Sequence, residues 1–402
     1  MSLVSNRLKL IKPSATLAVL QKANKLKSQG INIISLGAGE PAFDTPDNIK
    51  KAAIKGIEEG KTKYTNVDGM PELKKAIQDK FKRENNLTYE KDQIIVGTGG
   101  KQVLYNLFMA SLNEGDEVII PAPYWVSYPE MVAISGGVSV FVLCDIEVSF
   151  KLTPTALAKV ISPKTKWLLL NSPSNPTGSS YSQTELEAIA EVLRKHPHVH
   201  ILTDDIYEHI VFDDFKFYNL ASVAPDLKDR IFIVNGVSKA YSMTGWRIGY
   251  GAGAKELIEA MTVMQSQSTS NPCSISQVAA IEALNGTQSF IRPNSLDFQK
   301  KRNLALAILS TAPDLKCYKP EGAFYLFPEC KALFGKQTLE GKIIHNSNDL
   351  ASYLLETANV AVVPGIGFGL EGYFRISYAN DAEELEYACK RIVEACLQLK
   401  HA

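Results

Sequence analysis

The sequence predicts an α/β protein in which a large domain, built on a mostly parallel central sheet covered by helices, is joined to a smaller α+β domain. Helical periodicity alternates with short β-branched runs from about residue 46 to residue 300, the pattern of helices packed on both faces of a parallel sheet. After residue 300 a strand pair and a long final helix follow. We therefore expect a large domain at residues 46–300 and a small domain formed by residues 1–45 and 301–402.

Three segments of the large domain carry helix signals. Pro71 suits a first helical position and precedes apolar residues at helical spacing. Ser182 and Glu185 form a capping box ahead of another apolar face. A third helix is expected at residues 101–112, directly after a glycine-rich turn.

Between the helices lie short runs that are apolar on both faces, which is typical of strands in a buried sheet. We expect strands at residues 94–97, 117–121, 138–143, 166–170, 200–203 and 230–235. In the small domain the strand pair is expected at residues 323–327 and 374–378. The closing helix should bury Leu385, Ala388, Cys389, Ile392 and Val393 on one face.

Composition excludes several classes of protein. The chain has 402 residues, 45% of them apolar, and 43 basic residues balance 43 acidic ones. Such values exclude disordered and fibrous proteins, and zero net charge gives no global attraction to nucleic acid. The six cysteines are scattered without a Cys-x-x-Cys pair, and no apolar run approaches the roughly 18 residues of a membrane span. We expect a cytoplasmic protein with no bound metal, nucleic acid or membrane.

Unusual polar residues recur at the carboxyl ends of the expected strands, where open α/β sheets bind ligands. Asn175 follows the run at 166–170, and Asp204 and Tyr207 follow the next run. Lys239 and then Arg247 follow the last one. An amide, a carboxylate, a phenol, an amine and a guanidinium should therefore face one crevice.

This set of groups favours pyridoxal phosphate as the cofactor. A lysine forms a Schiff base with an aldehyde, and the ring nitrogen of this electron sink needs an acidic partner. Lys239 and Asp204 fit those roles, while Asn175 and Tyr207 would donate hydrogen bonds to the phenolate oxygen. Arg247 and the helix N-terminus after the glycine turn would hold the phosphate.

Nine motifs occur in the order found in one enzyme family. They are Pro13-Ser-Ala-Thr16, Gly37-Ala-Gly39-Glu-Pro41, Tyr64-Thr-Asn-Val-Asp-Gly69, Gly99-Gly-Lys101-Gln, Pro123-Tyr-Trp125, Asn175-Pro-Thr-Gly178, Asp204-Asp-Ile-Tyr207-Glu, Ser238-Lys239 with Arg247, and Phe374-Arg375-Ile-Ser. On these motifs the chain resembles a class I aminotransferase of the fold type I pyridoxal-phosphate family, and most closely the bacterial branch of the aspartate aminotransferases.

The resemblance implies a role for each matching residue. Lys239 would bind the cofactor covalently and move the substrate proton, with Asp204 and Tyr207 as further catalytic groups. Trp125 would lie over the cofactor ring, and Tyr64 would reach a phosphate across the interface of a homodimer. The other cofactor contacts implied are Gly99, Gly100, Lys101, Asn175, Ser238 and Arg247.

For the substrate, the resemblance implies that Arg375 grips the α-carboxylate bidentately beside the Gly39 backbone. Lys101, with help from around Thr16, would meet a distal carboxylate, and Lys12 near the entrance would serve a second acid group such as that of prephenate. Trp125 and Asn175 would also touch the substrate. The arginine with which the other branch clamps the distal carboxylate has no identifiable counterpart, so the residue that grips this group stays open.

The expected activity is therefore transfer of the amino group of L-aspartate to 2-oxoglutarate in two half-reactions. Aromatic or prephenate transamination, or both activities in one enzyme, is the alternative within the family, and elimination chemistry would use the same groups. A pyridoxal-phosphate-binding sensor domain is disfavoured, because the motifs begin at residue 13. A non-catalytic α/β protein is the remaining alternative.

Three other features have structural interpretations. The run His196-Pro-His198-Val-His200 has no Cys or acid at ligand spacing, so a surface loop is expected rather than a metal site. Asp205 is expected to cap a following helix. Cys273 has no partner in sequence and is expected to be a small buried residue.

Overall fold

The computed structural model describes residues 3–401, and its main feature is a seven-stranded sheet. The strand order is β2 (Ile94–Gly97), β8 (Gly249–Ala252), β7 (Ile231–Gly236), β6 (His200–Asp204), β5 (Thr165–Asn171), β3 (Glu117–Ala122) and β4 (Val138–Leu143). Strand β8 is antiparallel to both neighbours, and the ladder from β7 to β4 is parallel throughout. The predicted α/β class with a mostly parallel sheet is confirmed.

All six strands predicted in this sheet are present, and one was missed. Strand β8 contains Gly249 and Gly251, is followed by Gly253, and lacks the β-branched residues that mark a strand in sequence. The expectation of full burial is wrong for β4, which forms an edge of the sheet. There Val138, Phe141 and Leu143 are 50%, 46% and 68% exposed.

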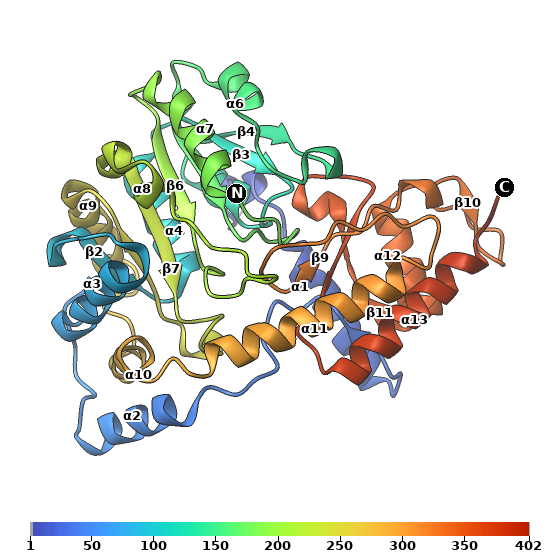
Figure 1. Ribbon diagram of the computed structural model, residues 1–402, viewed down its shortest axis with the longest axis horizontal. Coiled ribbons are helices and arrows are strands. Elements are labelled where there is room, and N and C mark those ends of the chain that lie inside the picture. The colour runs from blue at the N-terminus through green and yellow to red at the C-terminus, as the bar shows by residue number, and fades with distance from the viewer. Residues whose placement is uncertain (1–2, 402) are drawn as a thin grey trace.

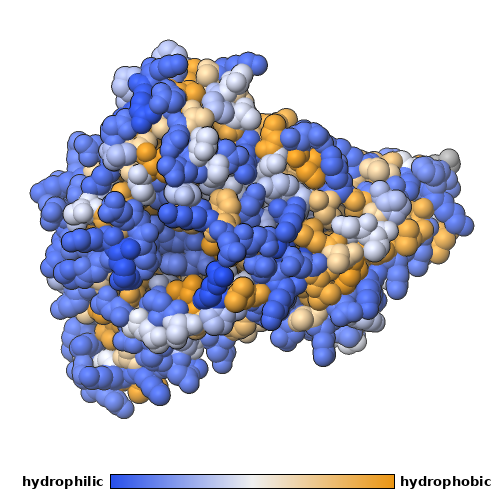
Figure 2. Space-filling view, viewed as in Figure 1, coloured by the Kyte–Doolittle hydropathy of each residue, from blue (hydrophilic) through white to orange (hydrophobic). Residues whose placement is uncertain are grey.

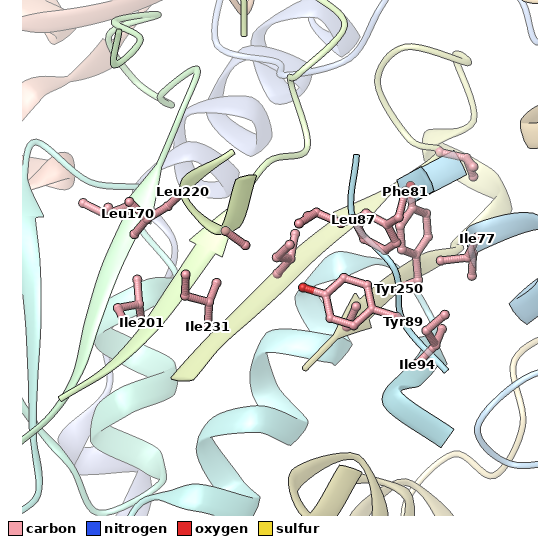
Figure 3. Packing of buried hydrophobic residues seen from close by; sticks show 14 of the residues in the cluster. Ile77, Phe81, Leu87, Tyr89, Ile94, Leu170, Ile201, Leu220, Ile231 and Tyr250 are labelled. Atoms are coloured by element: carbon pink, nitrogen blue, oxygen red, sulfur yellow. The ribbon is translucent and has the colours of Figure 1, made fainter. Parts of the chain in front are cut away.

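Successive side chains of each central strand enter two separate cores, as the period of a strand requires. One core takes Ile231 and Ile233 and packs against α3 and α10, whereas the other takes Phe232 and Val234 and packs against α4 and α9. Figure 3 shows part of the first core, where Ile201 lies beside Ile231 of the neighbouring strand and Phe81 packs against Tyr250 farther along the same core. Helices therefore cover both faces of the sheet.

The helices of this part are α2 (Asp47–Glu58), α3 (Pro71–Asn85), α4 (Gly100–Ser111), α5 (Tyr128–Ile134), α6 (Pro154–Val160), α7 (Gln183–Arg194), α8 (Leu220–Val223), α9 (Lys255–Ser266) and α10 (Ser274–Asn285). Pro71 occupies the first turn of α3, and the capping box of Ser182 and Glu185 opens α7. Both helix starts are as predicted from the sequence.

The smaller part combines the two ends of the chain (Figure 1). Its three-stranded sheet has the order β12 (Val363–Pro364), β13 (Phe374–Ser377) and β9 (Tyr325–Leu326), and the predicted strand pair is the antiparallel pair β13 and β9. Two further pairs are β1 (Ile34–Ser35) with β11 (Val360–Ala361), and β10 (Lys336–Gln337) with β14 (Lys400–His401). Its helices are α1 (Ala15–Ser28), α11 (Ile291–Leu309), α12 (Ser347–Thr357) and α13 (Ala382–Gln398).

The parallel pair β1 and β11 attaches the N-terminal segment to the C-terminal part of the chain. Helix α11 continues through residue 300 and extends from the large sheet to the smaller part (Figure 1). The boundary at residue 300 therefore falls inside a helix, and the domain limits stay a prediction.

Short 3-10 helices complete the fold: η1 (Asn6–Leu10), η2 (Lys91–Gln93), η3 (Ile146–Val148), η4 (Pro225–Arg230), η5 (Thr244–Trp246), η6 (Lys331–Leu333) and η7 (Gly365–Phe368). On the face shown in Figure 2 the surface is mainly hydrophilic, and apolar residues gather toward the smaller part. Within residues 3–401, no helix has the length and apolar character needed to cross a membrane.

Candidate active site

A cavity of about 400 Å³ opens where strands β5, β6 and β7 end, and the smaller part of the chain closes one side of it. It lies at the carboxyl edge of the sheet, as the sequence predicted. Twelve of the predicted site residues line it: Thr16, Gly39, Gly100, Lys101, Trp125, Asn175, Asp204, Tyr207, Ser238, Lys239, Arg247 and Arg375. Segments more than 350 residues apart in sequence thus meet around one space.

Lys239 follows the end of β7 and extends into the cavity. Its Nζ donates to the backbone carbonyl of Gly39 at 2.6 Å. Burial, followed by the nearby charge of Arg375, lowers the pKa of Lys239 to about 8. A substantial share of this amine is therefore neutral near physiological pH, which is the form that attacks a carbonyl group.

Asp204 is the last residue of β6, and it is buried at the floor of the cavity. Its Oδ2 accepts a 2.7 Å hydrogen bond from the Tyr128 hydroxyl, and its Oδ1 accepts one from the backbone N–H of Ile206. Burial raises the pKa of Asp204, and these two hydrogen bonds act in the opposite direction. A cationic ligand nitrogen beside this carboxylate would stabilise its ionised form.

Arg375 leaves β13 and ends in the cavity with only 2% of its surface exposed. Its guanidinium donates to Asn175 Oδ1 at 2.8 Å and to the Gly37 carbonyl at 2.6 Å, and it lies over the Tyr325 ring. Across residues 3–401 no carboxylate forms an ion pair with it, and its Nε has no hydrogen-bond partner. A buried cation without an anion is costly, so this arrangement favours an anionic ligand.

Arg247 and the start of α4 form a cationic corner of the cavity. Arg247 has a left-handed backbone (φ 55°) and donates to the Thr244 carbonyl at 2.8 Å. Gly99, the N-cap of α4, has φ 82°, and a Cβ there would lie 2.8 Å from Arg247 Cζ. The guanidinium and the free amides of the helix N-terminus therefore converge on a space that suits a phosphate.

Lys101, in the first turn of α4, adds another cation to the cavity lining. The Lys101 ammonium lies 4.8 Å from the Trp125 ring centroid, and burial lowers the pKa of Lys101, as does the charge of Arg247. Thr16 Oγ1 is buried and has no hydrogen-bond partner in the described part of the chain. Trp125 packs edge-on against Tyr128, which fixes the indole beside the cavity.

Three predicted residues lie outside the cavity lining. Gly99 acts through its contact with Arg247. Lys12 is exposed, and its backbone N–H donates to Glu130 Oε2 at 2.7 Å. Tyr64 is 91% exposed and does not line the cavity.

Comparison with known proteins identifies the family. The profile of aminotransferase class I and II matches residues 31–392. The chain belongs to the class I and II aminotransferases. A probable aspartate/prephenate aminotransferase from Rickettsia felis is 71% identical, over 98% of this chain and 97% of the relative. An aspartate/prephenate aminotransferase from Cereibacter sphaeroides is 56% identical, over 99% of this chain and 100% of the relative.

Solved structures agree with this family assignment. The aspartate aminotransferase from Rhizobium meliloti superimposes with a TM-score of 0.97 at 52% identity, with full coverage of both chains. The aspartate aminotransferase from Thermus thermophilus with maleate has a TM-score of 0.92 at 41% identity, over 98% of this chain and all of that one. The predicted resemblance to the aspartate aminotransferases is thus confirmed.

The sequence analysis of this aminotransferase missed several cavity residues. Tyr128 and Tyr325 are isolated tyrosines in the sequence, and only the fold brings their hydroxyls to Asp204 and Tyr207. Asn171 had a signal, because it directly follows the strand predicted at residues 166–170 and stands four residues before the motif Asn175-Pro-Thr-Gly178. Its Oδ1 accepts the Asn175 backbone N–H at 2.8 Å and so shapes the turn.

Two structural expectations are wrong. Turns rather than a helix follow Asp205, and its buried carboxylate accepts a hydrogen bond from the Asn219 side chain instead of capping a helix. Cys273 is exposed at the N-cap of α10 rather than buried. His198 lies on the surface as expected, with its ring hydrogen-bonded to the Ser162 carbonyl.

Proposed function

We propose that this aminotransferase uses pyridoxal 5′-phosphate, bound through Lys239, to transfer the amino group of L-aspartate to 2-oxoglutarate, giving oxaloacetate and L-glutamate. The observation that carries the proposal is the presence of a half-buried amine and a buried guanidinium in one cavity. Lys239 presents an amine of lowered pKa, and Arg375 presents a guanidinium with no acidic partner among the described residues. An amino acid substrate carries a carboxylate that would bind Arg375 and, next to it, an amino nitrogen that would react at the site of Lys239.

The residues present fit the cofactor. The cationic corner at Arg247 and Gly99 matches a phosphate, and a side chain at position 99 would fill that space. Asp204 supplies a buried carboxylate, held by Tyr128, that would pair with a pyridine nitrogen. When bound, pyridoxal phosphate accepts the electrons released as the substrate Cα–H bond breaks.

The protein groups would then divide the work as follows. Asp204 keeps a negative charge beside the ring nitrogen, while Asn175 and Tyr207 donate hydrogen bonds to the ring oxygen. Trp125 covers one face of the ring. The Lys239 amine would shuttle the proton between the substrate Cα and C4′ of the cofactor, and its place inside the cavity would limit loss of that proton to water.

Substrate recognition would use both ends of the cavity. Arg375 binds the α-carboxylate through its two forked nitrogens, beside the backbone of Gly39. At the other end, Lys101 and the unpartnered Thr16 hydroxyl would meet the distal carboxylate of aspartate or 2-oxoglutarate. The structure of the Thermus thermophilus enzyme with maleate, a dicarboxylate, is consistent with this arrangement.

Prephenate transamination is a second candidate activity. Relatives at 71% and 56% identity carry the name aspartate/prephenate aminotransferase. Lys12, held near helix α5 by its backbone bond to Glu130, would serve the second acid group of this larger substrate. Both activities would share the groups at Lys239 and Arg375.

We further propose that the working enzyme is a cytoplasmic homodimer. Tyr64 is 91% exposed and lies outside the cavity lining of its own chain, as expected for a residue that contacts the cofactor phosphate of a second copy. All six cysteines are free, which suits a reducing compartment.

The test is a comparison of substrates on the purified, cofactor-loaded enzyme. Aspartate with 2-oxoglutarate is assayed through oxaloacetate formation, and prephenate with glutamate or aspartate through arogenate formation. We expect turnover of aspartate, and absence of both the visible cofactor band and activity in Lys239→Ala. Equal rates with phenylalanine, alanine and aspartate would refute the dicarboxylate assignment, and a colourless wild-type protein after addition of the cofactor would refute the cofactor assignment.

A further inference from the structure

A pair of tyrosine hydroxyls joins the two parts of the molecule inside the cavity. Tyr207 follows β6 of the large sheet, and Tyr325 belongs to β9 of the small sheet. Their hydroxyl oxygens lie 2.7 Å apart, both side chains are buried, and both line the cavity. Nothing in the proposed function assigns a role to Tyr325.

The surroundings leave Tyr325 little freedom. A Cβ at Gly39 would collide with its hydroxyl, so the glycine makes room for it. The Arg375 guanidinium lies 4.6 Å from the centre of its ring. In the part of the chain that is described, the Tyr325 hydroxyl forms a hydrogen bond with Tyr207 alone.

Only one hydrogen can lie between the two oxygens, because each hydroxyl carries one proton. If that hydrogen belongs to Tyr207, Tyr207 presents only lone pairs to the cavity. If it belongs to Tyr325, the proton of Tyr207 is free to point at a ligand. The positive charge of Arg375 beside the Tyr325 ring favours the second arrangement, since it makes Tyr325 the better donor.

We propose that Tyr325 is a positioning residue that donates its hydroxyl proton to Tyr207, and so directs the Tyr207 proton at the ring oxygen of the cofactor. The inference rests on the proposed function, because it needs an anionic oxygen of the cofactor in front of Tyr207. The donated hydrogen bond also strengthens the one that Tyr207 makes, as bonds in a chain polarise one another. Tyr325 thereby sets the basicity of the lysine-bound cofactor without contacting it.

The test follows the visible absorbance of the lysine-bound cofactor as a function of pH. Donation to the ring oxygen stabilises its negative charge, so loss of a donor raises the pH midpoint of the absorbance change. We expect Tyr207→Phe to raise the midpoint by about one pH unit and Tyr325→Phe by about half a unit. The double variant should match Tyr207→Phe, because Tyr325 acts only through Tyr207.

Tyr378→Phe is the matched control. Tyr378 is buried next to the same small sheet and lies outside the cavity lining, and its hydroxyl donates to the Ala323 carbonyl. Its midpoint should equal that of the wild type, which separates the proposed role from loss of any buried hydroxyl.

Two results would overturn the inference. One is an unchanged midpoint in Tyr325→Phe, and the other is a double variant whose shift equals the sum of the single shifts, which would mean that Tyr325 acts independently of Tyr207. Failure of the proposed function looks different, because the wild type would then show no visible band that depends on Lys239.

Discussion

Replacement of Gly99 by alanine tests the phosphate corner of the cavity. Gly99 has φ 82° and ψ 159°, a conformation almost restricted to glycine. The added Cβ would lie 2.8 Å from Arg247 Cζ and closer still to the terminal nitrogen. Because the colliding group is the flexible end of a side chain, the guanidinium moves and the backbone keeps its fold. The change should therefore displace Arg247 from the phosphate.

The size of the effect follows from the hydrogen bonds that a displaced guanidinium can no longer donate to the phosphate. A hydrogen bond to a charged group contributes about 1.5 to 3 kcal/mol, and about 1.4 kcal/mol corresponds to tenfold in affinity. We therefore expect the dissociation constant of pyridoxal phosphate to rise by about 10- to 150-fold. The backbone strain costs a further ~1 to 3 kcal/mol in folding stability, which acts on the apoprotein as well.

The assay titrates apoprotein with the cofactor and follows the visible absorbance or the quenching of tryptophan fluorescence. Gly115→Ala is the matched control, since Gly115 has φ 85° and its Cβ would meet nothing within 4 Å. This control should lose stability by a similar amount and keep the wild-type affinity. A Gly99→Ala protein that binds the cofactor within threefold of the wild type would refute the reasoning, as would an equal loss of affinity in Gly115→Ala.

The remaining predictions concern three cationic side chains. Arg375→Lys should lower kcat/KM for aspartate by about 100-fold, because the bidentate hydrogen bonding to the α-carboxylate, about 3 kcal/mol, is lost while the positive charge is kept. A loss below fivefold in steady-state assays would contradict this. Burial lowers the pKa of Lys239 to about 8, so the rate at which apoprotein captures the cofactor should rise with pH through a midpoint near 8, as the amine becomes neutral; a stopped-flow midpoint near 10 would be inconsistent. Lys80→Met should reduce the free energy of unfolding in urea by about 3 to 5 kcal/mol, because it leaves Glu208 buried without its cation, and Lys80→Met with Glu208→Gln should recover part of that loss.

Much of the candidate site could be predicted because its polar residues lie at or just after the carboxyl ends of strands. Asp204 ends β6, and Lys239 follows β7, so strand patterns alone indicated that both would meet at one edge of the sheet. Helix starts were equally local, since Pro71 and the box at Ser182 act through residues within one turn. Helix starts of this kind can be predicted because the interacting residues are close together in the sequence.

What sequence reasoning missed depends on distant partners. Tyr128 reaches Asp204 across 76 positions, and Tyr325 reaches Tyr207 across 118 positions. A single tyrosine carries no pattern that reveals such a contact. The prediction for Asp205 was wrong for the same reason. Its motif resembles a helix cap, but its buried carboxylate accepts a hydrogen bond from Asn219, 14 residues later.

The missed strand β8 and the phosphate corner have one physical cause. Gly249 pairs with Gly97 on one side and Gly236 on the other, and a Cβ at Gly249 would collide with the backbone at Gly99 and Gly100. Glycine therefore removes the side-chain pattern by which a strand is recognised, and the same absence lets the N-terminus of α4 lie directly on β8. Since Arg247 stands two residues before β8 begins, this close approach is what brings its guanidinium to the free amides of the helix. Strand β8 therefore lacks a strand signal in the sequence because its glycines allow the close contact with α4 on which the anion site depends.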